Sequence, residues 1–152
     1  MLDRRQIHTV IDTLIREARI RSVSDIHITE GMPVWYRIHG CLTQARDVLK
    51  EYDIREVLLG MMNEKQRKQF EDGRDVDFAW QTTDGCRQRV NIFCEQKKIA
   101  ATIRLLNQHI PTLEELKIPT TLYQLSEEPR GIILVTGPTG SGKSTTLAAV
   151  IE

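Results

Sequence analysis

The residues from Gly137 to Ser144 combine glycines, a lysine and a serine at a spacing suited to phosphate binding. They read GPTGSGKS and match the pattern G-x-x-x-x-G-K-[ST] at each fixed position. The glycines let consecutive backbone N–H groups turn toward an anion, and a helix that starts at the end of the loop adds its positive N-terminal end. This order of residue types predicts a site for the phosphates of a nucleotide.

The last two residues of this P-loop have distinct expected roles. Lys143 would reach the β- and γ-phosphates of ATP, and the Ser144 hydroxyl would ligate Mg²⁺. The remaining contacts to ATP are expected from the rest of the loop and the residue after it, namely Gly137, Pro138, Thr139, Gly140, Ser141, Gly142 and Thr145.

The segments on either side of the loop support this interpretation over that of a glycine-rich loop without a nucleotide. The run Ile132–Val135 is apolar throughout, which is typical of a central parallel strand buried on both faces. A helix is expected from about Lys143, because Thr145–Ile151 is compatible with one. Residues 120–152 therefore read as the beginning of an α/β nucleotide-binding domain.

ATP hydrolysis needs more groups than this loop contains. A second acidic Mg²⁺ anchor and a residue that positions the attacking water normally come from later strands of the same sheet. Residues 145–152 are too few to contain such strands. We therefore expect the 152 residues to bind phosphate without supporting turnover.

Residues 1–106 carry the patterns of a separate α+β domain. Apolar side chains recur at helical spacing from Asp3 to Ile20, and Asp3 is suited to cap that helix. Asp84-Gly85 indicates a hairpin between two strands. The other expected elements are strands near 25–28, 34–38, 76–80, 87–93 and 99–106, and helices after Asp53 and over 63–70. Prolines punctuate residues 107–119, which we interpret as a linker.

The charge balance bears on which partners are expected. Lys and Arg together number 21, as do Asp and Glu, which argues against a nucleic-acid or membrane-surface footprint. No apolar run approaches the ~20 residues of a membrane span, and the N-terminus lacks an export signal, so a cytoplasmic protein without membrane insertion is expected. Cys41, Cys86 and Cys94 show no paired spacing and are expected as packed thiols.

Several short motifs extend beyond the P-loop and carry a family resemblance. Thr136–Ala149, reading TGPTGSGKSTTLAA, resembles the PilT family of type IV pilus-retraction ATPases, within the wider superfamily of secretion ATPases. Ser24–Ile28 (SDIHI), Arg87–Asn91 (RQRVN) and Ile103–Leu106 (IRLL) are similar to motifs of the N-terminal domain in that family. Leu113–Leu116 (LEEL) resembles its linker.

The resemblance implies a PAS-like N-terminal domain over 1–106, followed by the start of a RecA-like P-loop ATPase domain. It also implies a homohexamer that powers pilus retraction and twitching motility from the cytoplasm, held at the inner membrane by a platform protein. Two alternatives stay open: a pilus-assembly or type II secretion ATPase, and a non-catalytic docking module with a vestigial P-loop. The run Thr145–Ala149 favours the retraction branch.

By resemblance, the N-terminal domain supplies arginines to the nucleotide, and the motif positions assign this role to Arg89 and Arg104, with Arg87 as a further candidate. A guanidinium is always charged and its fork matches phosphate oxygens. The alternative is that these arginines are solvated strand residues paired with Asp or Glu.

Other residues that could do chemistry have simpler explanations. His27 and His39 could share a metal ion, but no ligand spacing supports one and structural histidines are favoured. Trp35, Tyr36 and Trp80 could stack on bases, yet no basic stripe accompanies them, and core or interface packing is favoured.

We predict that the 152-residue chain shows no measurable steady-state ATPase activity, because the second carboxylate and the water-positioning group act in the transition state. The measurement is phosphate release by the purified chain beside a Lys143→Ala control. Turnover well above that control would contradict the prediction.

Overall fold

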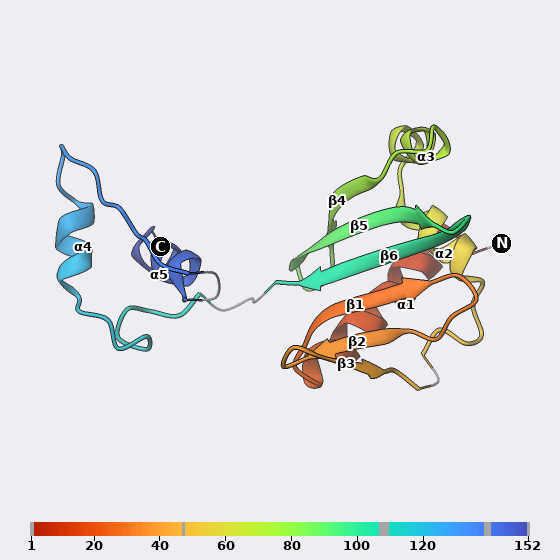
Figure 1. Cartoon of the computed structure of the whole chain (residues 1–152), viewed down its shortest axis with the longest axis horizontal. Coiled ribbons are helices and arrows are strands. Elements are labelled where there is room, and N and C mark those ends of the chain that lie inside the picture. The colour runs from red at the N-terminus through yellow and green to blue at the C-terminus, as the bar shows by residue number, and fades with distance from the viewer. Residues whose placement is uncertain (1, 47, 107–109, 139–140, 152) are drawn as a thin grey trace. The chain divides into compact units, whose positions relative to one another are not determined.

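The computed structural model of the chain describes residues 2–46, 48–106, 110–138 and 141–151. The chain divides into two compact units, Met1–Leu106 and Asn107–Glu152 (Figure 1). The sequence-predicted arginines lie in the first unit and the P-loop lies in the second.

In the described part of the first unit, six strands form one antiparallel sheet in the order β3-β2-β1-β6-β5-β4. Beside β1 lies β6, so segments from the two ends of the unit are adjacent at the centre of the sheet (Figure 1). The predicted α+β class and antiparallel sheet are confirmed. The strands are β1 (Val23–Thr29), β2 (Trp35–Ile38), β3 (Cys41–Gln44), β4 (Val76–Gln81), β5 (Arg87–Glu95) and β6 (Lys98–Leu105).

Helix α1 (Arg4–Ile20) forms where the apolar periodicity predicts it. Asp3 caps its start: the carboxylate accepts from the Gln6 backbone N–H, and the Gln6 side chain accepts from the Asp3 N–H. The side chains of one stripe are buried, and this stripe packs toward β1. Its members are Ile7, Ile11, Leu14, Ile15 and Ala18.

Two shorter helices follow the third strand. Asp53 caps α2 (Ile54–Met61), which packs against α1 and β6. Asn63 caps α3 (Glu64–Glu71), which lies beside β4 and has no buried residue among those described. The predicted caps and helices are thus confirmed to within a residue or two.

The core of this unit lies between α1, α2 and one face of the sheet. Strand residues alternate between this core and the opposite face, as a sheet covered on one side requires. Ile26, Val90 and Ile103 are fully buried and come from three neighbouring strands. Tyr36 and Trp80 are also buried, which confirms the packing role favoured for both.

The second unit contains two helices in its described residues, α4 (Thr121–Ser126) and α5 (Lys143–Ile151). A capping box forms ahead of α4: the Thr112 N–H donates to Glu115 Oε2 at 3.0 Å, and the Glu115 N–H donates to Thr112 Oγ1 at 3.2 Å. It closes a turn over 113–117 without starting a helix. Helix α5 begins at Lys143, as predicted.

The prediction of a buried strand at Ile132–Val135 is wrong for this structure. No strand forms there, and the side chains of Ile132 and Leu134 are 86% and 81% exposed. A strand needs a neighbour to take up its backbone N–H and C=O groups. In the described residues of the second unit, no extended segment pairs with this one.

The expectation of packed thiols is wrong for two of the three cysteines. Cys41 and Cys94 are exposed, whereas Cys86 is partly buried. Cys41 begins β3, an edge strand in which each residue is exposed, and Cys94 lies near the end of β5. Both positions lie away from the covered part of the sheet.

Gly60 in α2 lies against α1, with no room for a side chain. A Cβ at this position would lie 1.9 Å from Ile7 Cδ1, and Ile7 is buried. Gly60→Ala should lower the free energy of unfolding by about 1–3 kcal/mol, because overpacking outweighs the helix propensity gained. Chemical unfolding of the chain measures this effect.

The double variant Gly60→Ala/Ile7→Val provides the control. Removing Cδ1 relieves the clash, so the double variant should be more stable than Gly60→Ala alone. Additive losses from the two substitutions would contradict this account of the helix contact.

Candidate functional site

The face of the sheet turned away from α1 and α2, which we call the open face, places the predicted arginines together. Arg89 on β5 and Arg104 on β6 are direct cross-strand partners. Both are exposed, whereas their neighbours Val90 and Ile103 point into the core and are fully buried. The alternation of the two strands therefore brings two positive charges side by side on a surface.

Arg104 is held by a buried carboxylate from the neighbouring strand β1. Its Nε donates to Asp25 Oδ1 at 2.9 Å, and Asp25 lies directly opposite it in the β1–β6 register. The second oxygen, Oδ2, accepts from Ser24 Oγ at 2.9 Å and lies 3.7 Å from Arg37 Nε. The Asp25 side chain is 9% exposed, whereas that of Arg104 is 62% exposed.

Burial of Asp25 by itself would raise the pKa of its carboxyl group. The hydrogen bonds from Arg104 and Ser24, together with the charge of Arg104, act in the opposite direction and lower the pKa below its usual value. Asp25 is therefore a stable anion at neutral pH.

Arg89 is paired with a carboxylate from the edge strand β4. Its Nε lies 3.1 and 3.2 Å from the two oxygens of Asp77, and Nη2 donates to Oδ2 at 2.7 Å. Both side chains are exposed to solvent. The hydrogen bonds and charge of Arg89 lower the pKa of Asp77, and Asp77 in turn raises the pKa of Arg89.

A depression of about 260 Å³ lies between these pairs on the open face. Asp77, Arg89, Asn91, Thr102 and Arg104 line it. The aspartate partners fit the alternative interpretation, in which the arginines are solvated strand residues paired with Asp or Glu. The depression that both arginines line fits the interpretation as a phosphate site. Arg87 is exposed on the same strand but does not line the depression.

Sequence reasoning missed the two carboxylates. Asp25 lies within the quoted SDIHI motif, and Asp77 occupies the outward position between Val76 and Phe78. Each is an acidic residue within a predicted strand. Its arginine partner lies on a different strand, so the pairing does not follow from neighbouring residues in the sequence.

The β4–β5 hairpin that carries Arg89 is fixed to α1 by polar contacts. Asp12 Oδ2 accepts from the Thr83 N–H at 2.8 Å, and Arg19 Nη1 donates to Asp84 Oδ2 at 3.0 Å. Hydrogen bonds, of which that from Thr82 is the strongest, hold the pKa of Asp84 well below its usual range. The hairpin therefore has a defined position relative to the helix.

The two histidines lie in different surroundings. His27 Nδ1 lies 3.3 Å from Thr102 Oγ1, and burial lowers the pKa of His27. His39 lies in the turn between β2 and β3 with φ at 47°. Trp35 is 36% exposed and pairs with His27 across β1 and β2.

In the second unit, the P-loop leads directly into α5. Thr139 and Gly140 lie outside the described residues. Gly137 and Gly142 have positive φ values of 152° and 89°, and a Cβ at Gly137 would lie 2.8 Å from Ser141 Oγ. Glycine is therefore required for the backbone path observed at both positions.

Lys143 folds back over the loop. Its Nζ donates to the carbonyl oxygens of Gly137 at 2.7 Å and Pro138 at 2.6 Å. Ser144 and Thr145 are exposed in the first turn of α5. The ammonium group and the helix N-terminus thus occupy the same end of the loop, which is an arrangement suited to an anion.

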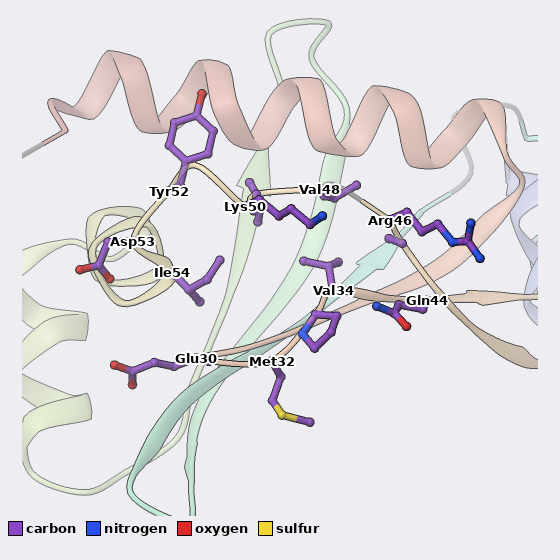
Figure 2. A pocket seen from close by; sticks show the side chains of 14 residues that line it. Glu30, Met32, Val34, Gln44, Arg46, Val48, Lys50, Tyr52, Asp53 and Ile54 are labelled. Carbon is purple, nitrogen blue, oxygen red and sulfur yellow. The ribbon is translucent and has the colours of Figure 1, made fainter.

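A larger cavity of about 620 Å³ lies elsewhere in the first unit (Figure 2). Glu30, Met32 and Val34 border it after β1. Residues of the segment between β3 and α2 border it from the other side, among them Arg46, Lys50 and Asp53. Charges of both signs line the cavity, which contains none of the sequence-predicted site residues.

Comparison with known proteins identifies the family. The model of the type II/IV secretion system protein family matches residues 1–152. The chain belongs to this family. It is 36% identical over 143 residues to the type IV pilus retractation ATPase PilT of Pseudomonas aeruginosa. The match covers 93% of the chain and 42% of PilT.

Two further relatives show the range of the family. The type II secretion system protein E of Aeromonas hydrophila is 31% identical over 160 residues, covering 94% of this secretion-family chain and 31% of that protein. A crystal structure of the pilus retraction motor PilT with bound ADP superposes with a TM-score of 0.79 at 37% identity, covering 93% of the chain and 42% of the motor. The resemblance predicted from the motifs is confirmed.

The secretion-family chain spans about two fifths of the length of its PilT relatives. Among its described residues, no helix combines the length and the apolar character needed to cross a membrane.

The Asp25–Arg104 pair predicts a pH-dependent contribution to stability. Asp25→Asn should lower the free energy of unfolding by about 1–3 kcal/mol at pH 7, because it removes a charged hydrogen-bond partner. The folded-state pKa is below the unfolded value of about 3.9, so the stabilisation is complete above that value and is lost as the pH falls through the folded-state pKa.

Urea unfolding of both chains from pH 7 to pH 3 measures this difference. The gap between the parent and Asp25→Asn should be constant near neutral pH and shrink below about pH 4. Asp72→Asn, which removes an exposed carboxylate paired with Arg74, serves as the control. A gap that is independent of pH would contradict the ionic role of Asp25.

Proposed function

We propose that the chain is the nucleotide-binding part of an ATP-driven motor of the pilus-retraction type. The proposal depends on the P-loop at the start of α5. The Lys143 ammonium group and the positive N-terminal end of α5 lie at the same loop, where both would attract an anion. Support for the retraction type comes from the type IV pilus retractation ATPase PilT, which is 36% identical to this chain over 143 residues.

In this proposal Lys143 exchanges the carbonyl oxygens of Gly137 and Pro138 for the β- and γ-phosphates of ATP. Backbone N–H groups of residues 137–142 and the side chains of Ser144 and Thr145 complete the contacts. Gly137 and Pro138, whose carbonyl oxygens Lys143 would leave, are both exposed residues, so water can replace the lysine there.

Mg²⁺ fits the residues at this position. The ion keeps several waters and phosphate oxygens as ligands, so it needs few protein groups. The exposed Ser144 hydroxyl, next to Lys143 in the first turn of α5, is one suitable ligand. When bound, Mg²⁺ would neutralise charge on the phosphates.

Arg89 and Arg104 have the second role in the proposal. We assign residues 1–106 to a PAS-like domain and 120–152 to the start of a RecA-like domain, with 107–119 as the linker between them. In a homohexamer the open face would present both guanidinium groups to a nucleotide, where they would stabilise charge on the transferring phosphoryl group. The motor would be cytoplasmic and act on an inner-membrane platform protein.

A pilus-assembly or type II secretion motor is the second candidate. The 31% identity to protein E of Aeromonas hydrophila supports it, since that value is only slightly below the identity to PilT. A cell that lacks the protein distinguishes the two candidates: pili that form but are not withdrawn indicate retraction, and missing pili or blocked secretion indicate the second candidate.

Alanine substitutions in the complete ATP-hydrolysing protein test the site. Arg104→Ala and Arg89→Ala should lower kcat by about 10–100-fold, less than the 10³–10⁵ of a dedicated arginine finger, while the melting temperature stays near that of the parent. Lys143→Ala should weaken nucleotide binding as well as turnover, because Lys143 contacts phosphate in the ground state.

Arg74→Ala is the matched control, since Arg74 is an exposed arginine paired with Asp72 and lies outside the depression. It should leave kcat unchanged. Parent-level turnover by both Arg89→Ala and Arg104→Ala would show that the open face has no part in hydrolysis.

A further inference from the structure

The two arginines of the open face differ in which nitrogen atoms are already engaged. Arg104 donates only Nε to Asp25, and neither of its Nη groups has a partner among the described residues. Arg89 uses the whole Nε–Nη2 edge on Asp77. A guanidinium binds phosphate best through two parallel N–H groups. Arg104 therefore has a free fork, and Arg89 must first release a carboxylate.

The two carboxylates also differ in how firmly they are held. Asp25 is buried, and its Oδ2 is engaged by Ser24 and lies near Arg37. Separating it from Arg104 would strand a buried charge, which is strongly unfavourable. Asp77 is 43% exposed and Arg89 is 65% exposed, so water and salt reach this pair and screen it, although its geometry is bidentate. Water can replace Arg89 around Asp77 but cannot easily replace Arg104 around Asp25.

The register places the two positive charges in direct opposition, with the negative charges on their outer sides. Like charges opposite each other on neighbouring strands repel. An anion in the depression would reduce this repulsion, whereas Asp77 at the rim of the same depression repels the anion. The local charges thus set a phosphate group and Asp77 in competition for Arg89.

We propose that Asp77 is a displaceable counter-ion of Arg89 and that Asp25 is a permanent anchor of Arg104. A phosphoanion that enters the depression takes Arg89 from Asp77 and leaves the Asp25–Arg104 pair intact. Asp77 then limits the affinity of the open face for the phosphoanion. Asp25 is a positioning residue that orients the Nη groups of Arg104 toward it. The role of the anion as part of a nucleotide rests on the proposed function.

Arginine side-chain NMR of the 152-residue chain tests the exchange directly. The chain carries Lys143→Ala, which removes the P-loop lysine, and inorganic pyrophosphate is the probe. The Nε–H resonances are assigned with Arg89→Lys and Arg104→Lys. Pyrophosphate should shift the Arg89 Nε–H resonance away from its Asp77-bound position, while the Arg104 Nε–H resonance stays at its Asp25-bound position.

Asp77→Asn and Asp72→Asn form a matched pair of variants, because each removes one exposed carboxylate from an arginine. Asp77→Asn should tighten pyrophosphate binding, followed through the Arg104 Nη resonances, by about fivefold at low salt, as expected for removing one charge at contact distance in water. Asp72→Asn should leave the affinity unchanged.

Equal effects of the two variants, a shift of the Arg104 Nε–H resonance as large as that of Arg89, or no binding to the open face in any variant would overturn the inference. These outcomes are separate from a failure of the proposed function. If Arg89→Ala and Arg104→Ala motors hydrolyse ATP at the parent rate, the nucleotide role is lost, while the exchange of Asp77 for pyrophosphate is still decided by the spectra.

Discussion

Two guanidinium groups stand directly opposite each other on the neighbouring strands β5 and β6, and the structure around them compensates for their repulsion. Arg89 and Arg104 are flanked on their outer sides by Asp77 and Asp25, so each positive charge has its own negative partner. The arrangement is possible only because α1 and α2 cover one face of the sheet and leave the other to polar side chains. One-sided packing thus supplies the hydrophobic stability of the unit and the exposed surface that can meet an anion.

The second unit shows the opposite situation, because the apolar run Ile132–Val135 is not buried against other residues. Ile132 and Leu134 are exposed although their run is apolar, because no other strand in the described residues of that unit pairs with them. The P-loop nevertheless has its glycine-dependent backbone and its lysine in place. Local chemistry therefore organises the loop, whereas burial of the preceding apolar run needs a pairing strand, which the described residues of this unit do not supply.

Local patterns in the sequence were sufficient to predict much of the first unit. Helix α1 with its Asp3 cap, the Asp53 cap of α2 and the Asp84-Gly85 hairpin all follow from neighbouring residues. The partners of the arginines did not follow, since Asp25 and Arg104 are 79 positions apart and meet only through the β1–β6 register. The strand at Ile132–Val135 was predicted incorrectly for a related reason: an apolar run shows that a segment could be buried, but not whether a partner strand is present to bury it.

The unequal burial of the two aspartates bears on what an arginine site in a cycling motor needs. If the proposed function holds, the open face must engage a nucleotide and release it in each cycle. If both arginines were fixed by buried carboxylates, only their Nη groups would be available to the ligand. If neither had a carboxylate partner, the two arginines would repel each other and would bind an anion too tightly for release. One anchored arginine fixes the geometry, and one arginine in a solvent-exposed pair can exchange partners at a lower cost than an arginine paired with a buried carboxylate. An affinity that is kept moderate by a competing carboxylate favours release after each turnover, which uniform tight binding would slow.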